Sequence, residues 1–248
     1  MPGDGVDRVL VVTAHPDDVD FGAAGTVAAF TASGVAVAYC IVTDGDAGGE
    51  DRTMPRHEMA AIRREEQRAA AAAVGVHDVT FLGYPDGRLE PTIEVRRDVT
   101  RVIRRVRPQR VVTQSPERDW GRIFASHPDH LAAGEAATCA VYPDARNPFA
   151  HPELLEDGLE PHVVDELWLM AAPAAVLPEP GRAAPVATTV AVEIDLDRKL
   201  DALACHRSQV GEVAGLRDRL ADWGSRVASD AGLPDGAFAE SFRRVRTV

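Results

Sequence analysis

The sequence has few cysteines and no long apolar run. Its three cysteines, Cys40, Cys139 and Cys205, are widely separated and form no C-x-x-C pair, so we expect neither a disulfide framework nor a zinc ribbon. The longest apolar stretch, residues 167–177, is interrupted by Pro173 and is too short to span a bilayer. We therefore expect reduced thiols, a cytoplasmic location and no membrane insertion.

Basic residues are also in the minority. The 248 residues include 27 lysines and arginines against 39 aspartates and glutamates, which gives a formal net charge of −12 at pH 7. Since nucleic acids and anionic membranes bind basic stripes, neither is an expected partner. Residues 1–7 contain no cationic segment followed by an apolar core, so no signal peptide is expected there. A small molecule is the expected partner, and the oligomeric state, a homo-oligomer included, is left open.

The composition and the order of the apolar runs predict the fold class. With 45% hydrophobic and 27% charged residues, the chain has an ordinary globular composition and the length of one large domain, which we expect to cover residues 1–248. The predicted strands are residues 8–13, 35–43, 78–82, 110–114, 166–171 and 188–194, and the predicted helices are residues 23–32, 56–74, 92–107, 131–141, 196–205 and 212–230. Their alternation predicts an α/β fold: a Rossmann-like, doubly wound parallel sheet with helices on both faces.

Two proline-rich segments and the last residues lie outside this alternation. Residues 142–161 are a predicted loop, and residues 173–185 are a predicted lid or linker between two strands. Residues 242–248 are predicted to add a strand at the edge of the sheet. A separate C-terminal domain is not expected, because too little chain remains for a large core of its own.

Two tetrapeptides carry most of the functional information: HPDD at residues 15–18 and HPDH at residues 127–130. Proline is favoured at the first position of a helix, and residues three apart lie on one face of it. Each motif therefore presents its first and fourth side chains together. An HPD sequence is also a simple helix start whose aspartate accepts bonds from unpaired N–H groups, and this alternative stays open for either motif alone.

The places of the two motifs in the predicted sheet favour a shared site. HPDD follows the strand at residues 8–13, and HPDH follows the strand at residues 110–114 after a loop. Open α/β sheets bind ligands outside the carboxyl ends of their strands, so two parallel strands of one sheet would bring both motifs to one rim. Two histidines and one carboxylate with an open position are the ligand set of a catalytic zinc site. A remaining carboxylate beside them can act as a general base.

Further segments accompany the motifs along most of the chain: TDG at residues 43–45, LGYPDG at residues 82–87, HRSQ at residues 206–209, and Arg63 with Glu66. With both HPD motifs, the chain resembles the PIG-L/LmbE-like family of metal-dependent de-N-acetylases. Members of this family remove acetyl groups from N-acetylglucosaminyl-phosphatidylinositol, from thiol-cofactor precursors and from glycosylated natural products. The resemblance implies a hydrolase that acts on a linear amide bond, with its active site at the carboxyl rim of the strands.

The resemblance also assigns the metal ligands and the base. It implies that His15, Asp18 and His130 bind one Zn²⁺ ion per chain, and that Asp17 is the general base. The native metal is left open between zinc and other divalent ions. The implied substrate is a small N-acetylated glycoside or amide.

Four other residues receive implied roles, each with a structural alternative. His127 would stabilise the oxyanion and protonate the leaving amine. Asp129 would orient or charge the His127 ring; the alternative is a helix N-terminal carboxylate. Arg63 and Asp86 are implied as substrate contacts, and the alternatives are a salt-bridged or solvated helix arginine and a turn-forming aspartate.

The chain departs from the family pattern at two positions. Many relatives follow HPDD with Glu, where this chain has Val19, and some have Tyr two residues before His127, where this chain has Ala125. Neither change touches the implied metal ligands, but both weaken the transfer of any one member's substrate. His206 is expected at a helix end, where a cationic ring suits the helix dipole, and a role at the rim of the site is the less favoured alternative. The other histidines have no ligand spacing and are expected to be structural: His57, His77, His151 and His162.

Three alternatives compete with removal of an N-acetyl group. The closest is hydrolysis of a larger amide, as in amidases of thiol-cofactor conjugates. A nucleotide-binding Rossmann protein is disfavoured because Gly22 and Gly25 are not part of a G-x-G-x-x-G sequence, and because the HPDD carboxylates would repel a pyrophosphate. A non-catalytic sugar-binding descendant is disfavoured because every expected catalytic residue is present.

Overall fold

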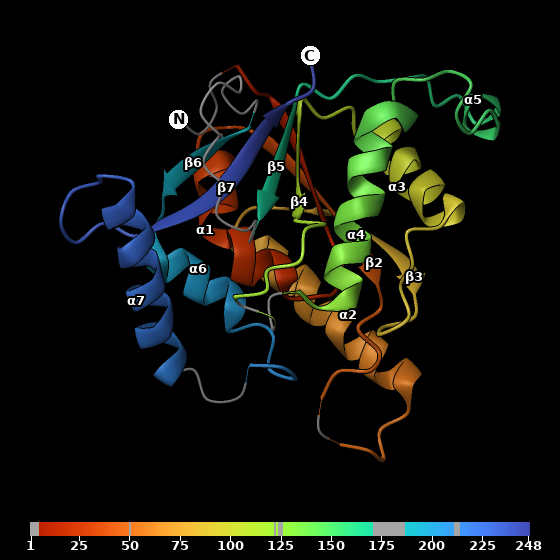
Figure 1. Ribbon diagram of the computed structural model, residues 1–248. Coiled ribbons are helices and arrows are strands. Elements are labelled where there is room, and N and C mark those ends of the chain that lie inside the picture. Colours follow the sequence, from red (N-terminus) through yellow and green to blue (C-terminus); the bar gives the residue numbers. More distant parts are fainter. Residues whose placement is uncertain (1–4, 50, 122, 124–125, 171–186, 211–213) are drawn as a thin grey trace.

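Seven strands form one mixed sheet in the computed structural model, which describes residues 5–49, 51–121, 123, 126–170, 187–210 and 214–248. The strands lie in the order β3-β2-β1-β4-β5-β7-β6 (Figure 1). They are β1 (Arg8–Thr13), β2 (Ala36–Thr43), β3 (Asp78–Tyr84), β4 (Arg110–Gln114), β5 (Glu166–Met170), β6 (Ala187–Glu193) and β7 (Ala239–Arg246). The helices are α1 (Asp18–Ala32), α2 (Arg56–Ala73), α3 (Ile93–Val106), α4 (Pro128–Cys139), α5 (Glu153–Glu156), α6 (Leu196–Leu203) and α7 (Ala214–Asp230), with a π-helical turn at Ala140–Asp144.

The first five strands run parallel to one another, as predicted, but the sheet is not parallel throughout. The last strand, β7, pairs antiparallel with β5 on one side and with β6 on the other. The prediction of an edge strand at residues 242–248 is therefore wrong, because β7 is internal and β6 forms that edge. An apolar pattern predicts that a segment is a strand, but it carries no information on which strands will be its neighbours.

Helices cover both faces of the sheet because successive side chains of a strand point to opposite sides. In β1, Val9 and Val11 belong to one core cluster, which also contains residues of α1, α2 and α6. Leu10 and Val12 of the same strand belong to a second cluster, with residues of α3 and α4. A third, smaller cluster joins α6 to α7. Two helical layers therefore sandwich the sheet, as the sequence predicts.

The fold brings the two HPD motifs to one rim. β1 lies at the point where the chain changes sides: β2 and β3 extend the sheet in one direction, β4 and β5 in the other. Open α/β sheets bind ligands at this switch point. α1 begins after β1, and α4 begins after the loop that follows β4. α4 approaches the end of β4 so closely that a Cβ at Gly134 would lie 2.3 Å from the carbonyl oxygen of Gln114.

Two predictions fall outside the described residues: the lid or linker at residues 173–185 and the departure at Ala125. Within the described part of the chain, no helix is long and apolar enough to cross a membrane. The predicted loop at residues 142–161 contains the end of the π-helical turn and the short helix α5. The buried guanidinium of Arg104 holds this loop by donating to several of its carbonyl oxygens.

Candidate active site

The HPDD segment forms a tight turn between β1 and α1. Asp17, directly before the first residue of α1, has φ 94° and ψ −28°, a left-handed backbone conformation that residues other than glycine seldom adopt. The backbone N–H of His15 donates to Oδ2 of Asp18 at 2.7 Å. Nδ1 of His15 lies 3.3 Å from the same oxygen. The turn therefore places the first and fourth side chains of the motif in contact.

The HPDH motif opens α4, with His127 as its N-cap. Nδ1 of His127 accepts a hydrogen bond from the backbone N–H of Asp129 at 3.2 Å. Nε2 of His130 lies 3.1 Å from Oδ1 of Asp18, so the two motifs touch. The ring centroids of His15 and His130 are 5.2 Å apart, and the His127 ring lies 5.0 Å from the first and 5.2 Å from the second. The three predicted ligands thus converge, with His127 beside them.

This cluster has the donor atoms of a metal site. Ring nitrogens of His15, His127 and His130 lie within 4.8 Å of one another. A nitrogen of His15 also lies within 4.8 Å of carboxylate oxygens of Asp86 and Asp129. Imidazole nitrogen and carboxylate oxygen are ligands that zinc prefers. The donor set therefore fits a divalent ion of this kind.

The charges around the cluster fit a cation as well. Burial opposes a positive charge on His15, but three carboxylates outweigh it and raise the pKa of the ring to about 12: Asp129, Asp18 and Asp86. Burial also opposes a charge on His130, and Asp18 raises the pKa of that ring too. The carboxylates therefore stabilise positive charge at this point, and a bound divalent ion would supply such a charge.

Asp17 lies beside the cluster and is partly accessible. Its side chain is 15% exposed, and its Oδ2 accepts a hydrogen bond from Nη2 of Arg63 at 3.0 Å. Burial and the negative charge of Asp18 raise the pKa of the Asp17 carboxyl to about 7, against the lowering effect of Arg63. A carboxyl group with such a pKa suits proton transfer near neutral pH.

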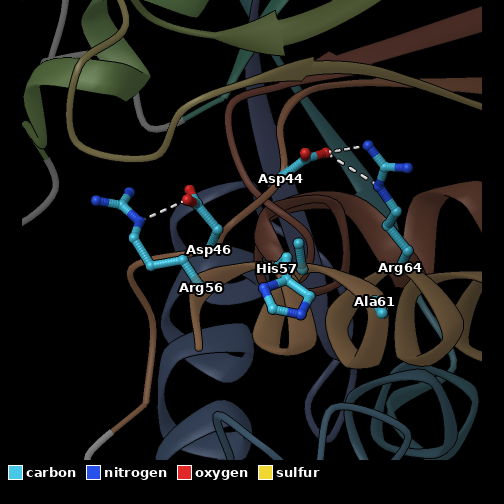
Figure 2. Close-up of a pocket in the computed structure, with 7 residues that line it drawn as sticks. Asp44, Asp46, Arg56, His57, Ala61 and Arg64 are labelled. Carbon is cyan, nitrogen blue, oxygen red and sulfur yellow. Dashed lines mark hydrogen bonds and ion pairs between the residues drawn. The ribbon is translucent and has the colours of Figure 1, made fainter. Parts of the chain in front are cut away.

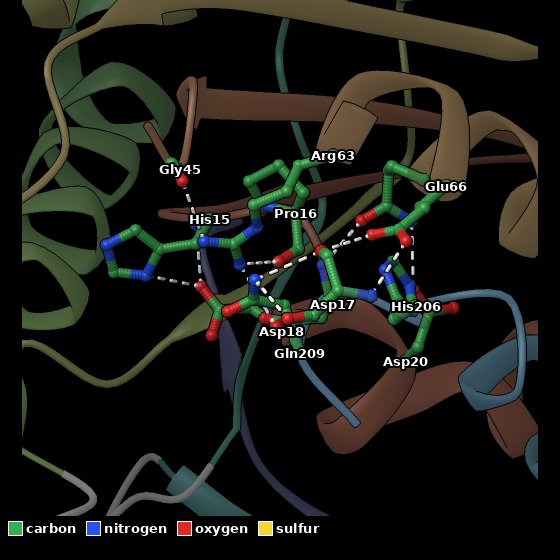
Figure 3. Close-up of polar contacts among 12 residues, drawn as sticks. His15, Pro16, Asp17, Asp18, Asp20, Gly45, Arg63, Glu66, His206 and Gln209 are labelled. Atoms are coloured by element: carbon green, nitrogen blue, oxygen red, sulfur yellow. Dashed lines mark hydrogen bonds and ion pairs between the residues drawn. The ribbon is translucent and has the colours of Figure 1, made fainter. Parts of the chain in front are cut away.

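The side chain of Arg63 is buried and contacts Asp17. Its side chain is 4% exposed, and its guanidinium donates to the carbonyl oxygens of Pro16 and Gly45 as well as to Asp17 (Figure 3). A Cβ at Gly45 would lie 2.6 Å from Nη1, so the loop after β2 packs directly on the guanidinium. These internal contacts are those of a salt-bridged helix arginine, and a contact of Arg63 with substrate stays a prediction.

The carboxylate of Asp129 contacts His15 and the turn after β3. Its Oδ2 lies 3.2 Å from Nε2 of His15 and accepts from the N–H of Gly87 at 2.7 Å, while its Oδ1 accepts from the N–H of Leu89 at 3.2 Å. Both oxygens thus bond to His15 and to backbone N–H groups, and the contact of Asp129 with the His127 ring runs through the backbone N–H of Asp129. A catalytic role of the Asp129 carboxylate stays a prediction.

The charge state of His127 is set by more than Asp129. Burial and the positive charges of His15 and His130 lower the pKa of the His127 ring. Asp129 raises that pKa, as expected, but by a smaller amount. The neutral ring is therefore favoured, and because its Nδ1 accepts a hydrogen bond, its proton resides on Nε2.

Asp86 contacts the cluster from the turn after β3. Its Oδ1 lies 3.0 Å from Nε2 of His15, and its Oδ2 accepts from the N–H of Ala47 at 3.3 Å. His15 is thus held between Asp18 on one ring nitrogen and Asp86 with Asp129 on the other. The side chain of Asp86 is 11% exposed, so a contact with substrate stays a prediction.

Two buried amides near HPDD were not identified from the sequence. Oε1 of Gln67 accepts from the N–H of Asp17 at 2.8 Å, and Oε1 of Gln114 accepts from the N–H of Ala14 at 2.9 Å. Glutamine has no metal-ligand signature, so neither residue was singled out. The one available signal was that Gln67 follows Arg63 by four positions and so lies on the same face of α2.

A buried acid–histidine pair also lies behind the site (Figure 3). Nε2 of His206 lies 2.7 Å from Oδ2 of Asp20, and both residues are completely buried. His206 therefore lies just after the end of α6, as expected, and its ring is a buried partner of Asp20 in α1. His206 lies far from both HPD motifs in the sequence, so its position there gave no indication of this contact.

A hollow of about 570 Å³ lies beside the site, between the loop after β2 and the first half of α2. Figure 2 shows two ion pairs on its wall: Asp46 with Arg56, and Asp44 with Arg64. His57 lines it as well, with only alanines as apolar residues. Its wall is therefore polar, with no large hydrophobic surface.

This hollow connects to the cluster through Asp86. The backbone N–H of Asp86 donates to Oδ1 of Asp46, and the backbone oxygen of Asp86 accepts from Arg56. The carboxylate of Asp86 reaches His15 at 3.0 Å. Asp86 thus links the wall of the hollow to His15, a candidate metal ligand.

A family model and several known proteins match this sequence. Residues 10–141 match the family model described as "PIG-L: GlcNAc-PI de-N-acetylase". The chain is 36% identical over 167 residues to a diacetylchitobiose deacetylase of Thermococcus kodakarensis, a match that covers 66% of this chain and 59% of that protein. It is 34% identical over 209 residues to a probable N-acetyl-alpha-D-glucosaminyl L-malate deacetylase 2 of Bacillus cereus, covering 82% of this chain and 83% of that protein.

A solved structure has the same architecture. The N,N'-diacetylchitobiose deacetylase from Pyrococcus horikoshii, complexed with an inhibitor, superimposes with a TM-score of 0.84 at 29% sequence identity. The match covers 99% of this chain and 86% of that one. The similarity therefore includes the C-terminal strands and helices as well as the segment that carries the HPD motifs.

Proposed function

Since this chain belongs to the PIG-L family, we propose that it is a zinc-dependent hydrolase that removes an N-acetyl group from an amino sugar or a glycosylated small molecule. One observation carries the proposal: the carboxylate of Asp18 touches His15 of its own motif and His130 of the other. The relatives named above are deacetylases of N-acetylated amino sugars. We keep a single domain and a cytoplasmic location as predictions.

We assign the metal to His15, Asp18 and His130, a set of three ligands that would leave a position open for substrate. The bound ion would polarise the acetamide carbonyl and lower the pKa of a water molecule. His127 stands beside these ligands, with its ring 5.0 Å from that of His15. The two imidazoles and one carboxylate favour zinc over magnesium or calcium, which prefer oxygen ligands.

Asp17 takes the proton of the attacking water. Arg63 holds its Oδ2, so we assign the proton to Oδ1. The water oxygen bonds to the acetamide carbon, and Asp17 becomes protonated. A general base in this position contributes roughly 10²- to 10⁴-fold to the rate.

His127 supplies a hydrogen-bond donor on the other side of the acetamide. Because Nδ1 of its ring accepts from the N–H of Asp129, Nε2 carries the proton and can donate to the developing oxyanion. The C–N bond then breaks, the amine nitrogen takes the proton that Asp17 removed from the water, and acetate leaves. Each turnover consumes one water and yields one acetate and one free amine.

We propose that the hollow beside the site receives the part of the substrate beyond the acetamido sugar. Its two Asp–Arg pairs offer both acceptors and donors, which suits the hydroxyl groups of a second sugar ring. An anionic group would compete with Asp44 and Asp46 for the arginines. A neutral hydroxyl-rich substrate is therefore the class that this wall favours.

The proposal is tested by acetate release from the zinc-loaded protein. Diacetylchitobiose, N-acetylglucosamine and an analogue with a larger acyl group are incubated with the protein, and the products are identified by mass spectrometry. We expect acetate and free amine from the first substrate, loss of activity with a chelator and recovery with zinc. Cleavage of the larger acyl group alone would support the amidase alternative. No cleavage of any amide by protein with one zinc per chain would overturn the proposal.

A further inference from the structure

Helix α2 holds both ends of the peptide unit that precedes the proposed base. The carbonyl oxygen of Pro16 and the N–H of Asp17 belong to one peptide plane. Arg63 donates to that oxygen, and Oε1 of Gln67 accepts from that N–H at 2.8 Å. The two side chains are four positions apart, on one face of α2. Side chains of one helix therefore bind both the carbonyl oxygen and the N–H of this peptide.

These two hydrogen bonds lie where the backbone is strained. Asp17 has φ 94°, in a region that residues other than glycine occupy only when the surrounding structure enforces it. A change in φ of Asp17 that is not compensated at Pro16 would relax this strain, and it would also turn the Cα–Cβ bond of Asp17 and move its carboxylate away from Arg63. Gln67 opposes this change because its side chain is completely buried and cannot follow the N–H into solvent.

A second contact fixes which way the amide of Gln67 points. Its Nε2 donates to Oδ2 of Asp20 at 2.9 Å, and that oxygen also lies 2.7 Å from Nε2 of His206. All three side chains are completely buried. With the amide reversed, its NH₂ group would face the N–H of Asp17 and its oxygen would face a carboxylate. Asp20 and His206 therefore keep the acceptor of Gln67 turned toward Asp17.

We propose that Gln67 is a positioning residue for the hydrolysis: it holds the Pro16–Asp17 peptide so that the Asp17 carboxylate meets the attacking water. The inference rests on the proposed function through the role of Asp17. The hydrogen bonds of Gln67 go to Asp17 and Asp20, which are not predicted metal ligands, and Gln67 does not line the hollow, so it acts on the rate of the chemical step and not on metal or substrate binding.

The test replaces Gln67 with a residue of similar length that cannot form hydrogen bonds. Gln67→Met should lower kcat by roughly 10- to 100-fold, because a small misplacement of a reacting group costs this much, while KM and zinc content stay close to wild type. Thr31→Val is the matched control. It removes a hydrogen bond from α1 to the carbonyl oxygen of Val74 at the far end of α2, 2.6 Å long, and should leave kcat unchanged.

Two readouts separate positioning from general loosening. In an Asp17→Asn background, Gln67→Met should change kcat less than about twofold, because a residue that acts through the base has nothing left to position. Amide hydrogen exchange at Asp17 should quicken about tenfold or more in Gln67→Met and stay unchanged in Thr31→Val. An equal loss of kcat in both backgrounds, or unchanged exchange at Asp17, would overturn the inference. If the wild-type protein cleaves no amide, the proposed function fails separately, and the exchange at Asp17 still decides whether Gln67 holds the peptide.

Discussion

Nε2 of His130 lies 3.1 Å from Oδ1 of Asp18, so a single contact joins the first turn of α4 to the first turn of α1. Neither helix could place this contact by itself. It exists because β1 and β4 are adjacent and parallel, with Val12 paired to Thr113 near the ends of both strands. The candidate metal centre therefore depends on the pairing of β1 with β4, which brings the two motifs together.

The two neighbouring aspartates of HPDD should separate chemistry from metal binding. Asp17→Asn removes the base but leaves the metal ligands in place, so we expect one zinc per chain and a turnover lowered by roughly 10²- to 10⁴-fold. Asp18→Asn should instead lower the zinc content, because Asp18 contacts both predicted histidine ligands. Metal analysis and steady-state kinetics on the two variants measure both quantities. Zinc lost from Asp17→Asn but kept by Asp18→Asn would reverse the assignment.

Replacing His127 should impair catalysis without removing the metal. His127→Ser is the better variant, because serine is a favourable N-cap and keeps α4 capped, while its side chain is too short to replace the ring as a donor. We expect zinc content to stay at one per chain and kcat to fall by roughly 10²-fold, the usual cost of losing a donor to an oxyanion. His77→Ala, at an exposed position, serves as the control and should keep full activity. Near-full activity of His127→Ser would show that the oxyanion is stabilised elsewhere.

The polar hollow predicts a substrate-dependent effect of Arg64. Arg64 lines the hollow and pairs with Asp44, so Arg64→Met should raise KM for diacetylchitobiose by about tenfold, as expected for one charge-assisted hydrogen bond. KM for N-acetylglucosamine, which lacks the second ring, should stay the same. Arg68→Met, one turn further along α2 and outside the hollow, is the matched control. An equal rise in KM for both substrates would place the second ring elsewhere.

The buried Arg104 should stabilise the segment after α4. Its guanidinium donates to the carbonyl oxygens of Asp144, Ala145, Asn147 and Ala150. Burial lowers the pKa of Arg104. Arg104→Met keeps the apolar stem but leaves these oxygens without the donor, so we expect the free energy of unfolding to fall by about 3 kcal/mol.

Urea unfolding measures this change, and a surface arginine of the same helix is the control. Arg101 pairs with Asp157 at an exposed position, so Arg101→Met should cost less than about 1 kcal/mol. Similar midpoints for Arg104→Met and the wild-type protein would show that these carbonyl oxygens find other partners.

The elements of the fold were predictable because their signals are local. A β-branched run before HPDD predicts β1, and an alanine-rich segment closed by Gly75 predicts α2; both are present within a residue or two of the expected bounds. The position of β7 was not predictable. Its residues read as a strand, but its place between β5 and β6 depends on pairings with segments far away in the sequence.

The sequence by itself determined where imidazoles and carboxylates stand together along the chain, because HPDD and HPDH place them at fixed spacings in helix-starting turns. Only the tertiary structure decided what each of these groups faces. Arg63 donates to the HPDD turn, and the carboxylate of Asp129 contacts His15. Gln67 of α2 accepts from the N–H of Asp17 at the start of α1. Hydrogen bonds between side chains from separate elements depend on how those elements pack, and no spacing along the chain encodes that packing.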